Sequence, residues 1–593
     1  MSSNDLITNV GKNSNDTATL IWSVADDLVG AYKPHEYGLV ILPMTVIKRF
    51  HDCLLPTHQA VLDTYKRVEK LAVKDGFLRK AAGNYKFYNT SPFTFQTLIA
   101  DPDNIVENFK AYLSGFSDNV QDILARMEFD AQVKHMEEAG LLYQVISDFC
   151  TDKGDFSPEK ISAVDMGYVF ENLVRRFSES YNEEAGAHFT SRDIIYLMSD
   201  LLVAGDESAF KGDGISKTVY DMTMGTSQML TCMEERLKQM DADADVTAFG
   251  QEFNPFTFGI AKADMLIRGG DPNNMQFGDT LSDDKFSGYK FDYVISNPPF
   301  GIPWKREEKE VTAEFKKGEA GRFAPGLPAK GDGQLLFMLN GLAKLKDDGQ
   351  MAIIQNGSSL FNGDAGSGPS EIRRYLIEND WLDAIVQLPN NAFYNTGIAT
   401  YIWLVMKNRP EEHLGKVQLI DASKCCSARR KNIGSKNVDI TKACRDLIVK
   451  AYGAYVDKNY EGVDENGSSI VVKSKVMDAV DFGYNKIVVE TPQTDENGNI
   501  IMKKNKPVAD TSKRDTENVP LAEDIDAYFE REVIPYNPQA WIDKSKIKVG
   551  YEIPFTRTFY EYQQIEPSEK IAARIEEYEK SLMAKLHDLF GGE

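Results

Sequence analysis

Hydrophobic residues in the first quarter of the chain recur every three or four positions, as they do along one face of a helix. This spacing predicts helices over residues 17–32, 38–55, 59–71 and 104–129. No strand-like alternation of any length interrupts them. The pattern therefore predicts an all-helical N-terminal domain over residues 1–155.

From residue 156 onward, short apolar runs alternate with longer amphipathic stretches. The short runs predict strands at residues 218–222, 248–252, 291–296, 351–356, 382–388 and 399–406. Helices are expected at residues 228–239, 255–268 and 334–345. Strands and helices in this order are typical of an α/β domain with a doubly wound parallel sheet, which we place at residues 156–485.

Three later stretches depart from this cadence. Residues 301–333 are rich in Gly, Pro and charge, and residues 491–518 are polar, so both are expected to be mobile loops or insertions. Residues 486–593, which include the second of these stretches, are expected to be a C-terminal extension that ends in a helix at about residues 568–590. One face of that helix carries an apolar stripe, formed by Ile571, Ile575, Tyr578, Leu582, Leu586 and Leu589. Such a stripe packs on its own domain or pairs with another chain.

The composition narrows the class of protein. A chain of 593 residues with 42% hydrophobic and 26% charged residues is long enough for two to four globular domains. No apolar run approaches the roughly 20 residues that span a bilayer, and the first residues lack the features of a signal peptide. The six cysteines form no CxxC pair, which favours reduced thiols in the cytoplasm and no metal site.

The sequence Asn297-Pro298-Pro299-Phe300 carries the most specific chemical signal. It follows the predicted strand 291–296, and the carboxyl ends of parallel strands are where such folds place their sites. The Asn297 amide oxygen and the Pro298 carbonyl can accept hydrogen bonds from the amino group of a nucleobase, while the prolines stiffen the backbone. Phe300 offers a ring on which a base can stack. The same residues also end strands in ordinary turns, so the surrounding sequence decides between the two interpretations.

Three acidic residues precede this motif at predicted strand ends. Asp221 closes the first strand and leads into Gly225-Thr226-Ser227. Glu252 ends the second, where a carboxylate can accept from both hydroxyls of a ribose. Asp279 ends a short run and could accept from an adenine amino group.

With these motifs in order, the chain resembles the DNA-modification (methylation) subunit of type I restriction-modification systems. That family comprises adenine-N6 methyltransferases that use S-adenosylmethionine. The resemblance covers nearly the whole length and rests on five further segments besides the tetrapeptide. They are residues 250–266, 184–190, 371–376, 386–389 and 393–397, the last three of which we assign to later strands.

The resemblance implies a role for each candidate residue. Asn297, Pro298, Pro299 and Phe300 would bind and activate an adenine flipped out of double-stranded DNA. The cofactor pocket would be formed by Phe189, Thr190, Asp221, Gly225, Thr226, Ser227, Glu252, Asp279 and Asn297. It also implies a separate specificity subunit that reads the DNA sequence and holds the C-terminal helix, a second copy of this chain, and possible assembly with a restriction (nuclease/translocase) subunit.

The cofactor loop departs from the family pattern, which is Asp-Pro-x-x-Gly-Ser/Thr-Gly. Here Met222 stands for the proline and Ser227 for the second glycine. Glycine permits positive φ and close approach of the backbone to a ligand, whereas Ser227 carries a Cβ. Either the loop adopts negative φ or cofactor affinity is reduced, and we expect an active enzyme.

The net charge of −23 bears on the DNA-binding interpretation, because a duplex repels a uniformly acidic surface. Either positive charge gathers in one cleft, or a partner supplies most DNA contacts. Three alternatives stay open at this point: a catalytically weak subunit that clamps DNA as a scaffold, a methyltransferase for another amide or amino substrate such as a protein glutamine, and a self-sufficient enzyme.

Overall fold

The computed structural model describes residues 20, 23–83, 85–180, 190–204, 206, 215–394, 396–496, 499–504, 506–561 and 566–590. The chain divides into two compact units, residues 1–553 and residues 554–593. Within the described ranges, no helix combines the length and apolar character that crossing a membrane requires.

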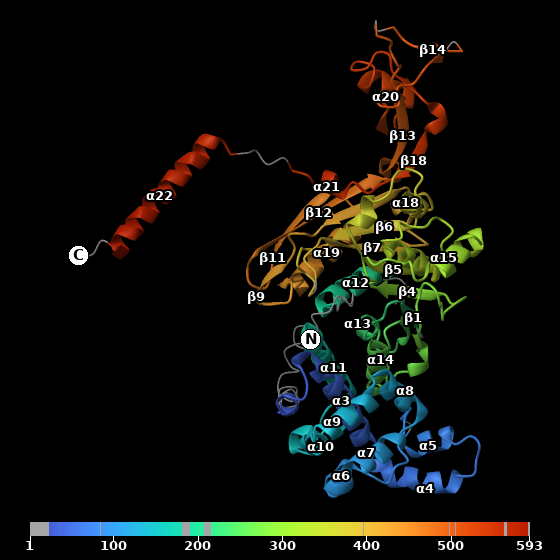
Figure 1. Ribbon diagram of the computed structural model, residues 1–593, viewed down its shortest axis with the longest axis vertical. Coiled ribbons are helices and arrows are strands. Elements are labelled where there is room, and N and C mark those ends of the chain that lie inside the picture. Colours follow the sequence, from blue (N-terminus) through green and yellow to red (C-terminus); the bar gives the residue numbers. More distant parts are fainter. Residues whose placement is uncertain are drawn as a thin grey trace. The chain divides into compact units, whose positions relative to one another are not determined.

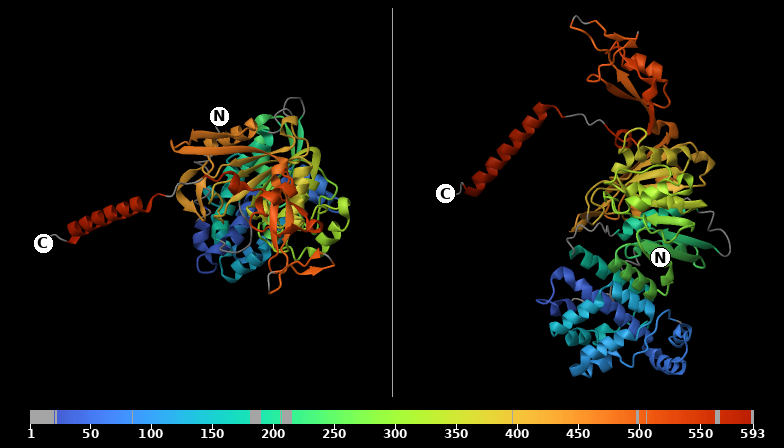
Figure 2. Two further views of the ribbon diagram at one scale, coloured as in Figure 1. Left: turned by 90° about the horizontal axis from the view of Figure 1, so that it is seen from above. Right: turned by 45° about the vertical axis from the view of Figure 1, so that its right-hand side comes forward.

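Helices make up the first part of the larger unit, drawn in blue to cyan in Figures 1 and 2. They are α3 (Tyr37–Leu54), α4 (His58–Val68), α5 (Asp75–Ala81), α6 (Phe95–Ile99), α7 (Ile105–Ser114), α8 (Asp118–Arg126), α9 (Phe129–Glu138), α10 (Leu142–Asp148) and α11 (Ala163–Ser180). One hydrophobic core joins them, from Leu20 to Phe177, and also includes Ile260 and Leu266 of α14 (Pro255–Ile267). The helical prediction for this region is confirmed for the described residues; residues 17–19, 21 and 22 of the first predicted helix lie outside them. The division at residue 155 stays a prediction.

The prediction of one helix over residues 104–129 is wrong, because the chain breaks between α7 and α8. A Cβ atom at Gly115 would lie 2.3 Å from Asn89 Oδ1, so only glycine fits at this break. The Gly115 carbonyl accepts a hydrogen bond of 2.8 Å from the Thr90 N–H, which ties the break to a distant segment. Apolar spacing continues across the break, and therefore periodicity does not reveal it.

The second part of the larger unit is built on a ten-stranded sheet with the order β11-β12-β8-β6-β7-β5-β4-β1-β2-β3. These strands are β1 (Ser216–Asp221), β2 (Asp245–Glu252), β3 (Met275–Phe277), β4 (Phe291–Ser296), β5 (Leu345–Asn356), β6 (Leu382–Gln387), β7 (Thr400–Met406), β8 (Lys416–Asp421), β11 (Lys458–Val463) and β12 (Ser469–Asp478). The expected α/β class is confirmed. The sheet is mixed rather than all parallel, because β7 runs antiparallel to β5 and β6.

Helices cover both faces of the sheet, as in a doubly wound fold. One face shares a hydrophobic core with four helices, which are α12 (Arg192–Ala204), α13 (Gln228–Met240), α14 and α19 (Lys442–Ala454). On the opposite face Tyr220 stacks on Phe291, with ring centroids 4.6 Å apart, and α16 (Gln334–Ala343) packs on β5.

The strand order fixes where the site can lie. From β1 the chain moves outward to β2 and β3, and it then returns to the other side of β1 to form β4. The sequence order therefore reverses between β1 and β4. Ligands bind at such a switch point, beyond the carboxyl ends of the strands. Asp221 and Ser296 are the last residues of these two strands.

Residues 301–333 are folded, so the expectation of a mobile loop is wrong. They contain α15 (Glu308–Phe315) and a small hydrophobic core that includes Trp304, Val311 and Phe323. The Arg322 guanidinium donates to the carbonyls of Thr280 and Leu281, at 2.8 and 3.1 Å. This arginine ties the segment to the chain that follows β3.

The assignment of residues 371–376 to a strand is also wrong, because they lie in helix α18 (Gly368–Glu378). Further along the chain, the described residues of the stretch 491–514 are largely irregular, with two-residue strands β14 (Met502–Lys503) and β15 (Lys506–Pro507). They precede β16 (Asp515–Pro520), which pairs with β13 (Gly483–Glu490) in a separate small sheet.

The second unit, taken by itself, contains α21 (Phe555–Thr558) and the long helix α22 (Ser568–Phe590). The apolar stripe of α22 is exposed at four of the predicted positions: Ile571 (38% exposed), Ile575 (57%), Tyr578 (70%) and Leu582 (59%). The side chains of Leu586 and Leu589 lie outside the described part of the chain.

Candidate active site

Three polar side chains join the ends of β1 and β4. Ser296 Oγ donates to Asp221 Oδ1 at 2.7 Å, and the Thr223 N–H donates to the same oxygen at 3.0 Å. The hydroxyls of Thr223 and Ser296 are 2.8 Å apart. Since Ser296 gives its one hydrogen to Asp221, Thr223 is the donor in that pair. The chain of bonds fixes the loop after β1 against the strand that carries Asn297.

Asp221 is 1% exposed, and its environment disfavours the ionised form. Burial raises the pKa of this carboxyl to about 7, against the lowering effect of the Ser296 and Thr223 hydrogen bonds. The negative charge of Glu252 raises it further. Asp221 therefore exchanges its proton near neutral pH.

Asn297 directly follows β4 and is partly buried. Its Nδ2 donates to Thr190 Oγ1 at 2.9 Å, and this bond orients the amide. Pro298 is buried, and Phe300 is partly buried against the core under the sheet. Phe189, predicted to line the pocket, lies outside the described residues.

Glu252 ends β2, next to β1. Its Oε1 accepts the N–H groups of Phe253 and Asn254 at 2.9 and 2.7 Å, and its Oε2 accepts the Gly225 N–H at 3.0 Å. Burial raises the pKa of Glu252, while these three bonds lower it. A carboxylate has about four acceptor positions, so one remains open on Oε2.

The loop from Met222 to Ser227 keeps the backbone shape that glycine favours. Ser227 has φ of +66°, which rules out the alternative in which the loop adopts negative φ. Gly225 also has positive φ, +55°, and a Cβ there would meet nothing within 4 Å. Thr226 lies between them, and α13 begins directly after Ser227. The serine substitution therefore leaves the loop in its left-handed form.

Asp279 follows β3 and stabilises its own loop, since Oδ1 accepts the N–H groups of Leu281 and Ser282 at 2.8 and 2.9 Å. The Glu307 carboxyl lies beside Asp279. Burial and this like charge raise the pKa of Glu307. The adjacent Arg306 lies over the exposed ring of Phe253, 5.0 Å from its centroid. The segment before α15 thus faces the ends of β2 and β3.

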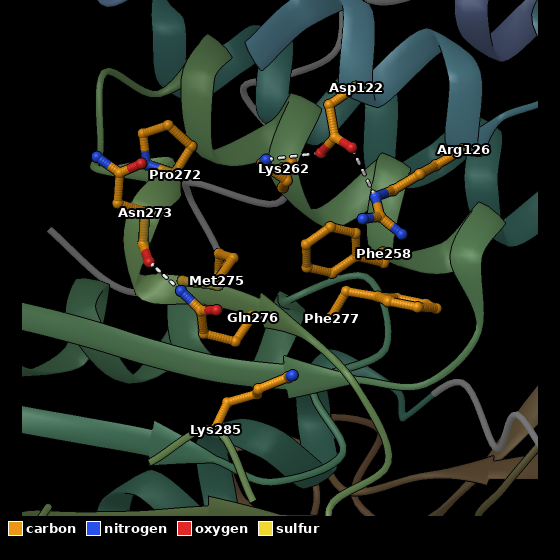
Figure 3. A pocket seen from close by; sticks show the side chains of 10 residues that line it. All are labelled: Asp122, Arg126, Phe258, Lys262, Pro272, Asn273, Met275, Gln276, Phe277 and Lys285. Carbon is orange, nitrogen blue, oxygen red and sulfur yellow. Dashed lines mark hydrogen bonds and ion pairs between the residues drawn. The ribbon is translucent and has the colours of Figure 1, made fainter. Parts of the chain in front are cut away.

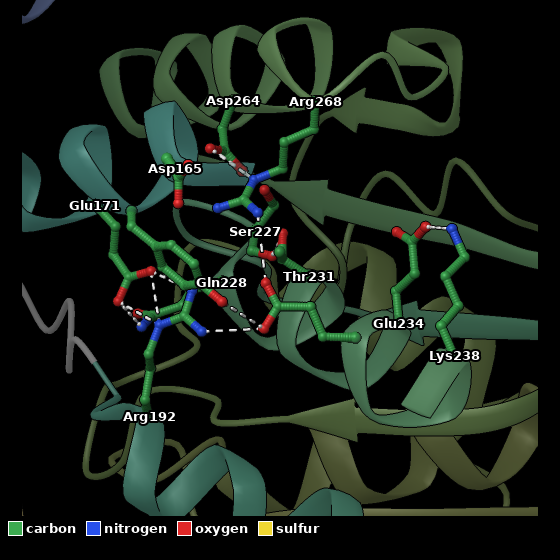
Figure 4. Close-up of polar contacts among 12 residues, drawn as sticks. Asp165, Glu171, Arg192, Ser227, Gln228, Thr231, Glu234, Lys238, Asp264 and Arg268 are labelled. Atoms are coloured by element: carbon green, nitrogen blue, oxygen red, sulfur yellow. Dashed lines mark hydrogen bonds and ion pairs between the residues drawn. The ribbon is translucent and has the colours of Figure 1, made fainter. Parts of the chain in front are cut away.

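A partly buried set of ion pairs joins α11, α12 and α13 next to the cofactor loop (Figure 4). Arg192, the first residue of α12, binds Glu171 of α11 at 2.5 Å and Glu235 of α13 at 3.2 Å. Gln228, the first residue of α13, donates to Glu171 at 2.5 Å. Because Thr190 stands two residues before Arg192, this network fixes the position of the Asn297 partner relative to the cofactor loop.

Sequence reasoning missed several of these residues. Thr223, Ser296, Phe253 and Glu307 were not among the predicted site residues, although Ser296 and Phe253 are adjacent to predicted ones and Thr223 lies between Asp221 and Gly225. Thr190 was expected near the cofactor, and its contact with Asn297 across 107 positions has no sequence signal. Among the described residues, no group of three or more His, Cys, Asp or Glu side chains is arranged to hold a metal ion.

Comparison with known proteins bears on the family. The model of the N-6 DNA methylase family matches residues 162–496, and the model of the HsdM N-terminal domain matches residues 17–149. The chain is 23% identical over 440 residues to the type I restriction enzyme MjaIX methylase subunit of Methanocaldococcus jannaschii, covering 70% of this chain and 74% of that one. It is 28% identical over 268 residues to the HindI methylase subunit of Haemophilus influenzae, covering 45% of this chain and 56% of that one.

Solved structures agree on the fold. A type I restriction-modification methyltransferase subunit from Streptococcus thermophilus superimposes with a TM-score of 0.61 at 23% identity, over 79% of this chain and 96% of that one. A modification subunit of a type I restriction enzyme from Vibrio vulnificus gives a TM-score of 0.50 at 15% identity, covering 87% of this chain and 98% of that one. Since the family model spans more than half of the chain and includes every described candidate residue, this protein belongs to the N-6 DNA methylase family and is a DNA methyltransferase, as its resemblance to type I methylation subunits predicted.

Proposed function

We propose that this chain is the modification subunit of a type I restriction-modification complex. It transfers a methyl group from S-adenosylmethionine to the N6 amino group of an adenine flipped out of double-stranded DNA. The observation that carries the proposal is the position of Asn297-Pro298-Pro299-Phe300 at the β1/β4 switch point, with the acidic end of β2 on the other side of β1. DNA as substrate implies a cytoplasmic complex.

The residues at the strand ends suit S-adenosylmethionine. The open acceptor position of Glu252 fits one ribose hydroxyl, and a second becomes available if the Gly225 N–H leaves Oε2. Asp279, whose Oδ1 accepts from its own loop, is proposed to accept from the adenine amino group, and the exposed Phe253 ring offers a stacking surface. When bound, this cofactor supplies an electrophilic methyl group on a sulfonium sulfur.

On the substrate side, Asn297 is the central residue. Thr190 receives a hydrogen from Asn297 Nδ2, so the amide oxygen is the atom that accepts from the adenine amino group. The Pro298 carbonyl accepts the second amino hydrogen, and Pro299 keeps the backbone rigid. Phe300 stacks on the base. These contacts draw the amino nitrogen toward a tetrahedral, nucleophilic geometry and align it, which supplies much of the rate enhancement.

The partners follow from charge and from α22. With a net charge of −23, the chain alone is expected to bind DNA weakly, and a specificity subunit supplies sequence reading and most DNA contacts. The exposed stripe of α22 is the proposed docking face for that subunit. A second copy of this chain and a restriction subunit complete the proposed complex.

The test is product analysis on the assembled enzyme. The chain, its specificity subunit and target DNA are incubated with S-adenosylmethionine, and the DNA is digested to nucleosides. We expect N6-methyladenine from the wild type and a rate at least about 100-fold lower from Asn297→Ala, as for loss of one transition-state hydrogen bond. Methylation of another base, or an Asn297→Ala enzyme with the wild-type rate, would refute the proposal.

Thr190 provides a sharper second variant. Thr190→Val removes the hydroxyl but keeps the shape, so the Asn297 amide loses its orienting partner. The expected result is a lower kcat with little change in KM for DNA, and recovery of kcat in Thr190→Ser. A loss confined to KM for S-adenosylmethionine would place Thr190 in the cofactor pocket alone.

A further inference from the structure

A cavity of about 400 Å³ lies between α8, α14 and the edge strand β3, whose Phe277 pairs with Glu252 of β2 (Figure 3). None of the residues assigned to the cofactor or the target base lines it. Its wall consists of Asp122, Arg126, Phe258, Lys262, Pro272, Asn273, Met275, Gln276, Phe277 and Lys285. The volume falls in the range of small-molecule sites.

Positive charge exceeds negative charge in this wall. Asp122 serves two cations at once, since Oδ1 lies 3.0 Å from Arg126 Nε and Oδ2 lies 2.9 Å from Lys262 Nζ. The third cation, Lys285, pairs with Asp283 at 2.6 Å. One carboxylate neutralises only one of the Arg126 and Lys262 charges, so a net positive charge faces the cavity. In a chain with a net charge of −23 such a surplus is notable, and it attracts anions.

Arg126 is held in place and has donors to spare. Its guanidinium lies 4.2 Å from the ring centroid of Phe277 and 4.8 Å from that of Phe258. Its one hydrogen bond to a described residue uses Nε, so within the described part of the chain both Nη groups have no acceptor. A guanidinium with two free Nη groups presents the paired donors that bind phosphate oxygens.

The other side of the cavity has groups that suit the nucleoside part of a nucleotide. Gln276 donates its amide to the Asn273 carbonyl at 2.7 Å, which leaves its Oε1 and the Asn273 side chain for a ligand. Phe277 and Phe258 add apolar surface beside them. Aromatic rings and amides next to cations form a wall of the kind that holds a nucleoside phosphate.

We propose that this cavity is a phosphate-binding site, in which Arg126, Lys262 and Lys285 bind the phosphate group of a nucleotide. The group can come from a free nucleotide or from the backbone of the DNA. Both sources present the same chemistry to the three cations. None of the lining residues is assigned to the proposed methyl-transfer site, so the test does not depend on that function.

The experiment measures binding to the full-length chain by calorimetry, with inorganic pyrophosphate, ATP and a short DNA duplex as separate probes. The variants are Lys262→Gln and Arg126→Gln, and Lys262→Arg keeps the charge. The control is Lys238→Gln, because Lys238 forms a similar pair with Glu234, at 2.6 Å, on the surface of α13 (Figure 4). Thermal unfolding of each variant shows whether it remains folded.

Each outcome either supports the proposed phosphate-binding site or rules it out. Binding of pyrophosphate or ATP that falls at least about tenfold in Lys262→Gln, and is kept in Lys262→Arg and Lys238→Gln, identifies a free nucleotide as the ligand. If only duplex DNA responds, with a salt slope reduced by about 1 in Lys262→Gln, the phosphate belongs to DNA. No binding of any probe, or equal binding by Lys262→Gln and the wild type, overturns the proposal.

Discussion

Ser227 adopts a backbone conformation that glycine favours, although it carries a side chain. It adopts φ of +66° and is fully buried, and within the described part of the chain its Oγ has no hydrogen-bond partner. A left-handed backbone costs an L-residue with a Cβ roughly 1–2 kcal/mol, and a buried unpaired hydroxyl adds to that cost. The loop therefore holds its shape against a local penalty.

Replacing Ser227 by glycine should stabilise the protein. We expect Ser227→Gly to raise the free energy of unfolding by about 1 kcal/mol, measured as a higher urea midpoint. Ser227→Ala is the matched control, since it removes the hydroxyl but keeps the Cβ. If alanine gains as much as glycine, the unpaired hydroxyl and not the backbone explains the effect.

Asp221 should make stability depend on pH. Its pKa is about 7 in the folded chain and 3.8 ordinarily, so the folded state holds the extra proton between these values. Stability from this residue therefore falls as pH rises from about 4 to 7 and is level above that. Asp221→Asn keeps the acceptor for Ser296 and Thr223 but cannot ionise. The urea midpoint should fall less between about pH 5 and about pH 8 in Asp221→Asn than in the wild type. An equal fall in both proteins would contradict the raised pKa of Asp221.

Several site residues could be predicted because they follow strands that periodicity reveals. Glu252 and Asn297 each stand at or just beyond the end of an apolar run, and a parallel sheet brings such ends together. The bond between Thr190 and Asn297 could not be predicted, because it depends on how α12 packs under the sheet. The conformation of Ser227 could not be predicted either, since residue identity left open whether the loop adopts negative φ.

At the level of elements, residues 301–333 show how composition misleads. Gly, Pro and charge suggested mobility, yet Arg322 organises the segment from a nearly buried position. Its guanidinium binds Glu314 Oε2 at 2.7 Å and Asn340 Oδ1 at 2.8 Å, besides the two carbonyls after β3. In a sequence, a charged residue is normally assigned to the protein surface. Only the packing of the folded chain shows that the Arg322 side chain is enclosed.

Removing Arg322 should loosen that segment. Arg322→Ala leaves the Glu314 carboxylate partly buried without its partner, and we expect a loss of about 3 kcal/mol in the free energy of unfolding. Limited proteolysis should then cut within residues 301–333. Arg374→Ala is the control, because that arginine pairs with glutamates at an exposed position. Equal resistance of Arg322→Ala and the wild type would mean that the hydrophobic core holds the segment alone.

Strand direction is a second limit at this scale. The run at β7 is buried along its whole length, as parallel strands are, and yet it runs antiparallel. Buried strands of either direction appear as continuous apolar runs. The sequence could therefore predict that β7 exists, but not how it is inserted between β5 and β6.

Across the whole molecule, charge and the C-terminal helix point to assembly. The proposed function expects a partner to supply most of the cations that contact DNA, because this chain is acidic, and α22 presents apolar side chains to solvent. Large exposed apolar side chains at helical spacing are typical of a surface that another helix covers. The account therefore predicts that α22 is required for assembly and not for the catalytic fold.

Polar substitutions on the stripe should test this requirement. Ile575→Asp combined with Leu582→Asp should abolish co-elution with the specificity subunit in size-exclusion chromatography, because a buried unpaired charge prevents helix packing. S-adenosylmethionine binding by the isolated chain should be unchanged. Lys580→Ala lies on the opposite face of the helix and should assemble normally. Full assembly by the double variant would assign the docking surface elsewhere.

The most direct test of the account is calorimetry of S-adenosylmethionine binding to the full chain, for the wild type and Glu252→Ala. The account predicts that the wild type binds and that Glu252→Ala binds at least about 100-fold more weakly, since a carboxylate that holds ribose hydroxyls is lost. Glu234→Ala, at the surface of α13, should bind as the wild type does. Absence of wild-type binding even with the specificity subunit and DNA, or undiminished binding by Glu252→Ala, would contradict a cofactor site at the β1/β4 switch point.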